Sequence, residues 1–166
     1  MNELPDLQAG GINAFGLTVS QPDEIMHGAT LGWPGWHQQL ELWMRTGFLS
    51  QLVDRLLAGG FTVCLSADHG NLESIGIAAI QDGVLAERKG QRVRVYPNTT
   101  LRNRAHESTG EAGKVWDSAL LPEGFFPLFA AGRGAFVTKG DKVVAHGGAS
   151  LDELLVPWVT IRKGDL

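Results

Sequence analysis

Short apolar runs, separated by glycine and polar residues, alternate with one longer amphipathic stretch. The runs at residues 15–20 and 61–67 are nearly continuous, as in strands that are buried on both faces of a parallel sheet. Between them, apolar side chains recur at three- and four-residue steps, which predicts a helix over residues 38–58. Its stripe consists of Leu49, Leu52, Val53 and Leu56. We therefore predict a right-handed strand–helix–strand unit in an α/β fold with a mostly parallel sheet flanked by helices.

The second half of the chain has shorter patterns. Strands are predicted at residues 93–96, 134–138, 142–145 and 158–162. The sequence from Ser150 to Glu153 matches a capping box, in which the serine and glutamate side chains bond backbone N–H groups at a helix start. We expect a short helix there, directly after His146, and expect its cap to help fix the approach of that histidine.

Three fragments that follow apolar runs carry side chains that bind metals. Asp68 and His69 are adjacent at the end of one run, and a glycine after them allows a sharp turn. Asp23 and His27 are four positions apart, so a helix would place them on one face. His146 follows a further run and precedes two glycines. Each fragment alone is more often a turn or a surface histidine, but three of them in one chain favour a metal centre.

The three motifs together resemble a known superfamily. Their order, Asp-x-x-x-His, then Ala-Asp-His-Gly, then His-Gly-Gly-x-Ser-Leu-x-Glu-Leu-x-Val-Pro, is similar to the C-terminal part of the alkaline-phosphatase superfamily. The last motif most resembles the PglZ domain of bacterial phage-defence systems of the BREX type. Cofactor-independent phosphoglycerate mutases share the first two motifs, but the last motif fits the PglZ branch better. We expect a single partial domain over residues 1–166, the C-terminal portion of such a domain, with residues 1–14 a leader or irregular segment.

The resemblance implies a two-metal centre for hydrolysis or transfer of a phosphate ester. One ion would be held by Asp23, His27 and His146. The second would be held by Asp68 and His69, together with a hydroxyl nucleophile and another aspartate from an early strand. Those last two groups have no counterpart in this sequence, so the catalytic nucleophile is unassigned and the isolated chain is expected to be inactive. Two cations stabilise charge on the attacking and leaving oxygens, and this ligand set suits zinc, or manganese when oxygen ligands dominate.

A different class of function stays open beside the enzyme. The chain could be a non-catalytic scaffold or interaction module of a phage-defence complex. The partners that the resemblance implies are a phosphate-ester substrate and other phage-defence proteins. Part of a larger sheet would also expose a strand edge and apolar surface, and so promote self-association.

Basic residues concentrate between residues 87 and 104. Arg92 and Arg94 alternate with valines, as on a strand with one solvated face. Two interpretations stay open. The arginines could guard the edge of a sheet, or they could contact a polyanion and draw a phosphate-rich substrate toward the metals.

Composition narrows the class of protein. At 166 residues and 43% hydrophobic, the chain can form one core, and its net charge of −4 argues against a generally basic nucleic-acid binder. The single cysteine, Cys64, falls inside an apolar run and is expected to be buried, so no disulfide framework is predicted. The sequence has neither the charged-then-apolar pattern of a secretory leader nor a membrane-spanning stretch, which predicts a cytoplasmic protein without membrane contact.

Several conspicuous residues are assigned no chemistry. His37 and His106 are expected to be structural or solvated, and Glu73 to be a solvated carboxylate. Trp33 and Trp36 have two open interpretations. They could form the wall of a substrate pocket, or they could cover hydrophobic core.

Overall fold

The computed structural model describes residues 11, 13–28, 31–77, 80, 86 and 88–164. Most of the predicted leader, residues 1–10 and 12, therefore lies outside the described residues. The helices are α1 (Gln21–Gly28), α2 (Gly32–Met44), α3 (Phe48–Ala58), α4 (Thr99–Thr109) and α5 (Leu151–Leu154), with a 3₁₀ turn at Gly110–Ala112. The strands are β1 (Val63–Leu65), β2 (Leu72–Gly76), β3 (Arg88–Lys89), β4 (Val93–Tyr96), β5 (Gly113–Val115), β6 (Phe126–Ala130), β7 (Gly134–Ala135), β8 (Lys142–Ala145) and β9 (Val159–Ile161). None of the helices among these residues has the length and apolar character of a membrane span.

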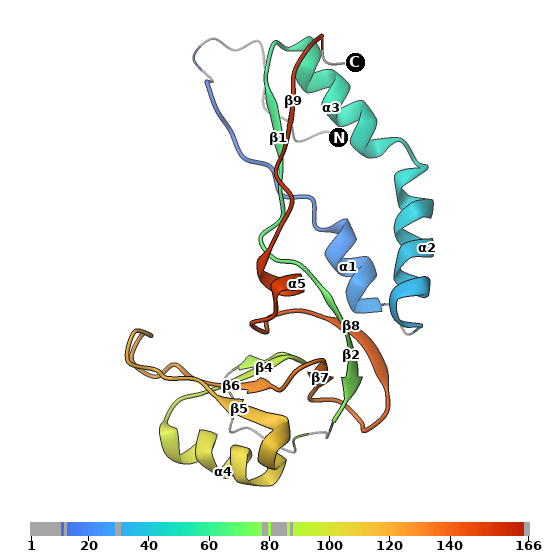
Figure 1. Cartoon of the computed structure of the whole chain (residues 1–166). Helices are drawn as coiled ribbons and strands as arrows, with labels where there is room; N and C mark the ends of the chain where they lie inside the picture. The colour runs from blue at the N-terminus through green and yellow to red at the C-terminus, as the bar shows by residue number, and fades with distance from the viewer. Residues whose placement is uncertain are drawn as a thin grey trace.

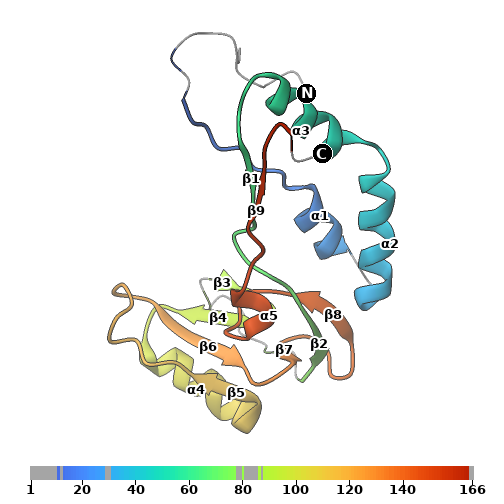
Figure 2. The ribbon, with the colours of Figure 1, turned by 45° about the horizontal axis from the view of Figure 1, so that its top comes forward.

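The molecule has a helical part and a sheet part (Figure 1). β1 and β9 form a two-stranded ribbon that extends away from the other strands toward α3, with α1 and α2 beside it. The sheet part contains a three-stranded sheet, in the order β7-β2-β8, and a four-stranded sheet, in the order β3-β4-β6-β5. Figure 2 shows α4 against the four-stranded sheet and α5 where the ribbon meets the sheets.

The strand pairings confirm an α/β fold but not a mostly parallel sheet. β2 and β7 are parallel, and the other described pairs are antiparallel. The predicted first strand, residues 15–20, is extended but forms no ladder with a described strand. Its side chains supply the contacts instead: Phe15 packs edge-on against Phe61 with ring centroids 5.3 Å apart, and Val19 packs on the core below α3. Without a ladder to β1, the predicted parallel crossover does not form.

The predicted long helix is two helices. α2 begins six residues before the predicted start at residue 38, and the chain leaves helical geometry between Met44 and Phe48. Gly47 has φ +74°, a left-handed conformation that glycine adopts without steric cost, and it ends one helix and precedes the next. The predicted apolar stripe is confirmed on α3, where Leu52 and Leu56 are buried against Val63 of β1.

The sheet part has its own core. Tyr96, Leu128 and Phe136 are almost completely buried and pack with Ala105 of α4. α4 begins at Asn98, whose side chain accepts a 2.9 Å hydrogen bond from the backbone N–H of Leu101.

The predicted solvated strand around Arg92 is buried. β4 has the predicted bounds, but it lies between β3 and β6 and is not an edge. Arg92, directly before it, is only 2% exposed, and Arg94 is half-buried and donates to the Phe136 carbonyl at 3.4 Å. Arg92 therefore has no surface with which to contact a polyanion, and the edge-guard interpretation is wrong as well. The alternation with valines has a different cause, because both faces of β4 are covered.

The ribbon is more open than its sequence predicted. Cys64, expected to be buried, is exposed, and its sulfur lies 3.9 Å from the Thr160 hydroxyl on β9. The apolar run at residues 61–67 contributes only β1 to a ladder. Val63 and Leu65 pack on the core below α3, whereas Cys64 alternates to the opposite face of the ribbon, where it is exposed.

Candidate metal centre

Helix α1 carries two of the predicted ligands. Pro22 lies in its first turn, where a residue without a backbone N–H loses no intrahelical hydrogen bond. Met26 is buried and anchors the helix. Asp23 and His27 lie one turn apart, with His27 Nε2 3.4 Å from Asp23 Oδ2. The predicted helical spacing of the pair is therefore confirmed.

The pairing of β2 with β8 brings two further histidines together. The strands are antiparallel, and Leu72 at the start of β2 lies opposite Ala145 at the end of β8. His69 comes shortly before β2 and His146 directly after β8, so both leave the sheet at the same end. Their imidazole rings stack, with centroids 3.8 Å apart and an angle of 7° between the planes.

Hydrogen bonds tie the segment before β2 to α5 and to the segment after it. Ser66 Oγ donates to the Pro157 carbonyl at 2.9 Å, and the Gly70 N–H donates to the Glu153 carbonyl at 2.8 Å. A Cβ at position 70 would lie 2.0 Å from the Asp152 carbonyl oxygen. Only glycine permits this approach, which holds the loop in place.

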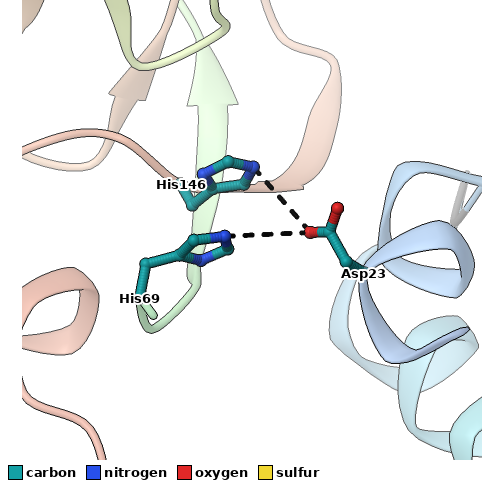
Figure 3. A group of neighbouring side chains, drawn as sticks. All are labelled: Asp23, His69 and His146. Atoms are coloured by element: carbon teal, nitrogen blue, oxygen red, sulfur yellow. Dashed lines mark ion pairs between the residues drawn. The ribbon is translucent and has the colours of Figure 1, made fainter. Parts of the chain in front are cut away.

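Asp23, His69 and His146 form the candidate metal centre (Figure 3). Each offers one ligand atom, and the three atoms lie within 4.8 Å of one another. Asp23 Oδ1 is 3.9 Å from Nε2 of His69 and 3.9 Å from Nε2 of His146. The Asp23 side chain is 46% exposed, so an ion can reach the centre from solvent.

The hydrogen bonds of His69 define which ring nitrogen faces Asp23. Nδ1 lies 3.0 Å from the Gly70 carbonyl oxygen. Because a carbonyl only accepts, Nδ1 carries the hydrogen, and in the neutral form of the ring the lone pair of Nε2 is therefore directed at Asp23. Asp23 Oδ1 is buried and has no hydrogen-bond partner among the described residues. Two acceptors thus face each other, an arrangement that a cation between them would stabilise.

His146 is held in the form that binds metals. Burial lowers the pKa of His146 below its ordinary value, and the neighbouring His69 lowers it further, while the Asp23 carboxylate opposes both effects. Neutral imidazole is the form of histidine that binds a metal ion. The environment of His146 therefore favours binding at neutral pH.

The two distances from Asp23 are short enough for its carboxylate to share an ion with each histidine. Zinc bonds of about 2.0–2.1 Å to nitrogen and oxygen allow two ligand atoms on one ion to be up to about 4.2 Å apart. Both 3.9 Å separations from Asp23 lie within this limit. Two imidazoles and a carboxylate, with a fourth position free, are also the ligand set of many catalytic zinc sites.

Comparison with known protein families identifies the family of this chain. The family described as the BREX system PglZ alkaline phosphatase-like domain matches residues 15–161, which include every predicted ligand. The chain belongs to the PglZ family. No curated protein and no solved structure matches it significantly. The family recognised from the three motifs is thereby confirmed, whereas the share of a PglZ domain that the chain represents stays a prediction.

In this PglZ-family chain, the two remaining predicted ligands lie beside the centre. The His27 ring is 5.5 Å from that of His146, and it approaches the Asp23 oxygen that does not face His69. Asp68 Oδ1 is 3.8 Å from His69 Nε2, and its side chain is 93% exposed. The three-residue centre thus includes His69 where the resemblance implies His27. The assignment of the five residues to two ions stays a prediction.

The tryptophans and leftover histidines lie outside the centre. Trp33 and Trp36 are half-buried with ring centroids 4.9 Å apart, and the Trp36 indole donates to the Pro22 carbonyl at 3.5 Å. They therefore support α1 on α2, next to Asp23. His37 is exposed and stacks on Trp33 at 5.2 Å. His106 lies on α4 in the sheet part.

Glu73 is a helix cap and not a solvated carboxylate. Its Oε1 accepts a 3.1 Å hydrogen bond from the Trp33 backbone N–H at the start of α2. The N-cap residue of that helix, Leu31, has no side chain that can bond there. A carboxylate also favours the positive end of a helix dipole. The two residues are 40 positions apart in the sequence, so no local sequence pattern predicts this hydrogen bond.

Proposed function

We propose that this PglZ-family chain binds a divalent metal ion at Asp23, His69 and His146 and serves hydrolysis or transfer of a phosphate ester in bacterial phage defence. Zinc is the ion we expect, with manganese as the alternative. His27 and Asp68 would complete the ligand set of this ion or hold part of a second one.

The buried oxygen of Asp23 is the observation that carries this proposal. It faces two ring nitrogens at 3.9 Å and has no hydrogen-bond partner among the described residues, and in the neutral form of His69 the facing Nε2 has no hydrogen to donate. A carboxylate oxygen in water would gain hydrogen bonds, so leaving it buried without a donor costs free energy unless a cation fills the space.

The chain's own residues would prepare the centre for phosphoryl chemistry. When bound, a divalent ion polarises a phosphoryl oxygen and lowers the pKa of a hydroxyl nucleophile. The Gly70 carbonyl keeps His69 in one tautomer, burial keeps His146 neutral, and α1 holds Asp23 against both. These are the tasks of groups that orient ligands around a metal.

Calorimetric titration with Zn²⁺ tests the proposal. We expect about one site in the wild-type chain, lost in Asp23→Ala, His69→Ala and His146→Ala. His27→Ala decides the grouping, because the resemblance implies loss of the site whereas the described geometry implies retained binding. His37→Ala is the matched control, since that histidine is exposed and stacks on Trp33. Equal Zn²⁺ binding by the wild type and the three ligand variants would refute the assignment.

Hydrolysis of an aryl phosphate and of an aryl phosphodiester, with Zn²⁺ or Mn²⁺ added, tests the reaction class. The assay includes the chain alone and the chain with the other proteins of its defence system. We expect turnover only in the second case, and loss of that turnover in Asp68→Ala and His69→Ala. Turnover that survives both substitutions would contradict a phosphoesterase role for this centre.

One observation favours the scaffold as a second candidate. Large apolar side chains are exposed along the C-terminal segment: Leu151, Leu154, Leu155, Val156, Trp158 and Val159. Such a strip is typical of a surface that contacts another protein. A complex that assembles normally with Asp23→Ala chains, and protects cells from phage without metal binding, would support the scaffold over the enzyme.

A further inference from the structure

A buried ion pair lies behind the candidate metal centre, at the junction of the ribbon and the sheets. Arg92 and Glu153 are each 2% exposed. Arg92 Nε donates to Glu153 Oε1 at 2.9 Å, and Arg92 Nη2 donates to Glu153 Oε2 at 3.0 Å. Taking two charges out of water costs several kcal/mol per ion, so a buried pair is a weak means of stabilising a fold. The contacts of Arg92 and Glu153 indicate a different role for the pair.

The carboxylate of Glu153 holds the loop that carries His146. Oε1 accepts a 2.8 Å hydrogen bond from the Gly148 N–H, two residues after the histidine. Oε2 accepts from the Ser150 N–H at 3.2 Å and from the Ser150 hydroxyl at 2.6 Å. A Cβ at Gly148 would lie 2.5 Å from the carboxylate, so the loop packs directly on it. The carboxylate thus sets the path by which the chain leaves His146.

The backbone of the same residue holds the loop that carries His69. The Glu153 carbonyl accepts the N–H of Gly70, the residue next to that histidine. One residue therefore contacts both histidine loops, one through its main chain and the other through its side chain. The stacked rings of His69 and His146 lie beyond these two contacts.

Arg92 fixes the carboxylate from the sheet part. Its remaining guanidinium nitrogen, Nη1, donates to the Gly134 carbonyl, and its own carbonyl accepts from the Ala130 N–H at 2.9 Å. A two-pronged guanidinium–carboxylate contact defines the orientation of both groups, which a single point charge does not.

We propose that Arg92 and Glu153 are positioning residues, which hold the loops of His69 and His146 at the spacing that lets both rings face Asp23. The pair acts through the loops and touches no ligand atom. The inference rests on the proposed metal-binding function only where Zn²⁺ affinity is the readout. The spacing of the two rings can be measured without metal.

Two substitutions separate positioning from plain stabilisation. Glu153→Gln leaves the Arg92 charge buried without a counter-ion, so it should lower both stability and Zn²⁺ affinity. The double variant Arg92→Met/Glu153→Leu replaces the pair with apolar side chains, which often restores stability. It cannot restore the acceptors for the N–H groups of Gly148 and Ser150. Asp152→Asn is the matched control, because that neighbouring carboxylate is exposed and pairs with Arg133 at 3.7 Å.

The measurements are urea unfolding, calorimetry with Zn²⁺, and nuclear Overhauser contacts between the His69 and His146 rings in metal-free protein. In the double variant we expect near-wild-type stability, weakened ring contacts, and a Zn²⁺ dissociation constant raised about 10- to 100-fold. Wild-type ring contacts and Zn²⁺ affinity in the stable double variant would overturn the proposal. If the double variant does not fold, Arg92→Lys takes its place. It keeps the charge but loses the two-pronged contact, and unchanged ring contacts and Zn²⁺ affinity there would also overturn the proposal.

Zn²⁺ affinity and ring contacts together distinguish the proposed metal binding from the proposed positioning by Arg92 and Glu153. A wild-type chain that binds no Zn²⁺, but whose ring contacts depend on Glu153, would refute the metal function and support positioning. A chain that binds Zn²⁺ with the same affinity and ring contacts in every variant would support the metal function and refute positioning.

Discussion

The two sides of helix α5 reverse the usual distribution of polar and apolar residues. On the inner side, the charged Glu153 is 2% exposed, and its carboxylate accepts hydrogen bonds from Arg92 and from the Gly148 N–H. On the outer side, Leu151 is 72% exposed and Leu154 is 61% exposed. Glutamate is rarely buried and leucine is usually buried in folded proteins. Within about one helical turn, the chain buries the charge of Glu153 and leaves two leucines in water.

The difference teaches that the two sides are specified by different forces. The inner side is defined by directional hydrogen bonds, which fix the loops of the candidate centre in one arrangement. The outer side has apolar area without a described partner, so its free energy depends on what covers it. Changes on the inner side should therefore alter folding and metal binding, while changes on the outer side should alter association.

Gly70→Ala should break the inner side most severely. The added Cβ would lie 2.0 Å from the Asp152 carbonyl oxygen, so the backbone of the His69 loop would have to move away from α5. We expect a loss of more than about 4 kcal/mol in the free energy of unfolding, among the largest effects of single substitutions. Urea unfolding measures it. Gly16→Ala is the control, because its Cβ meets no atom within 4 Å. Equal stability of the two variants would mean that the close approach of α5 is not made in solution.

Acid should weaken the inner side through Glu153. Burial alone would raise the pKa of Glu153, but hydrogen bonds from Arg92, Ser150 and Gly148 and the charge of Arg92 lower the pKa from 4.5 to about 2. A carboxyl group with a lowered pKa stabilises the fold above its ordinary pKa, and this contribution is lost as pH falls toward the folded-state value. The shift corresponds to about 3 kcal/mol.

Unfolding of the wild type and of Glu153→Gln from pH 7 to pH 2 measures this contribution. The stability difference between them should be constant above about pH 5 and should shrink as the pH falls from 4.5 to about 2. A difference that stays constant over the whole range would contradict an ionised Glu153 in the folded state.

Glu73→Ala should lower the stability of the fold moderately, because it removes the cap of α2, the helix on which α1 packs. The carboxylate caps α2 at the Trp33 N–H, and removing a helix cap costs about 1 kcal/mol. Glu73→Gln keeps an acceptor and should lose only the part due to charge at the helix dipole, a few tenths of a kcal/mol. Thermal unfolding of the two variants separates these effects. If Glu73→Ala is as stable as the wild type, Glu73 does not cap α2 in solution and is the solvated carboxylate that the sequence predicted.

Local patterns predicted the parts of this molecule that local forces determine. β4 and β8 have the predicted bounds, and the capping box of α5 forms with both of its hydrogen bonds. Helix α1 also forms after Pro22 and places Asp23 beside His27. The helix and the capping box are made by residues that are neighbours in the sequence, whereas β4 and β8 follow local patterns but pair with the distant strands β6 and β2.

The parts that the sequence did not predict depend on distant contacts. β2 contains a glutamate, a serine and a terminal glycine, and it is a strand because it pairs with β7 and β8, not because of its own propensity. Its register with β8 puts His69, and not only His27, beside Asp23. The Arg92–Glu153 contact spans 61 positions, and an arginine between polar and β-branched residues looks solvated until its partner is known.

The exposed apolar strip that continues from the outer side of α5 to Val159 should affect association and hardly affect stability. Among the described residues β1 pairs with β9 alone, and Trp158 and Val159 are exposed beside this ribbon. Open strand edges with apolar side chains promote pairing between copies, and lysines at such edges prevent it. We expect the wild-type chain to self-associate at tens of micromolar and Trp158→Lys/Val159→Lys to be monomeric. Because both side chains already contact solvent, the free energy of unfolding should change by less than about 0.5 kcal/mol.

Sedimentation velocity over a range of concentrations tests this expectation. Leu120→Lys is the matched control, because Leu120 is 98% exposed but lies between β5 and β6 in the sheet part, away from the ribbon. It should leave association unchanged. A wild-type chain that is monomeric at every concentration would show that the apolar strip needs no cover from a second copy. A double variant that loses several kcal/mol of stability would show that the ribbon is packed in solution, and the contrast between the two sides of α5 would then disappear.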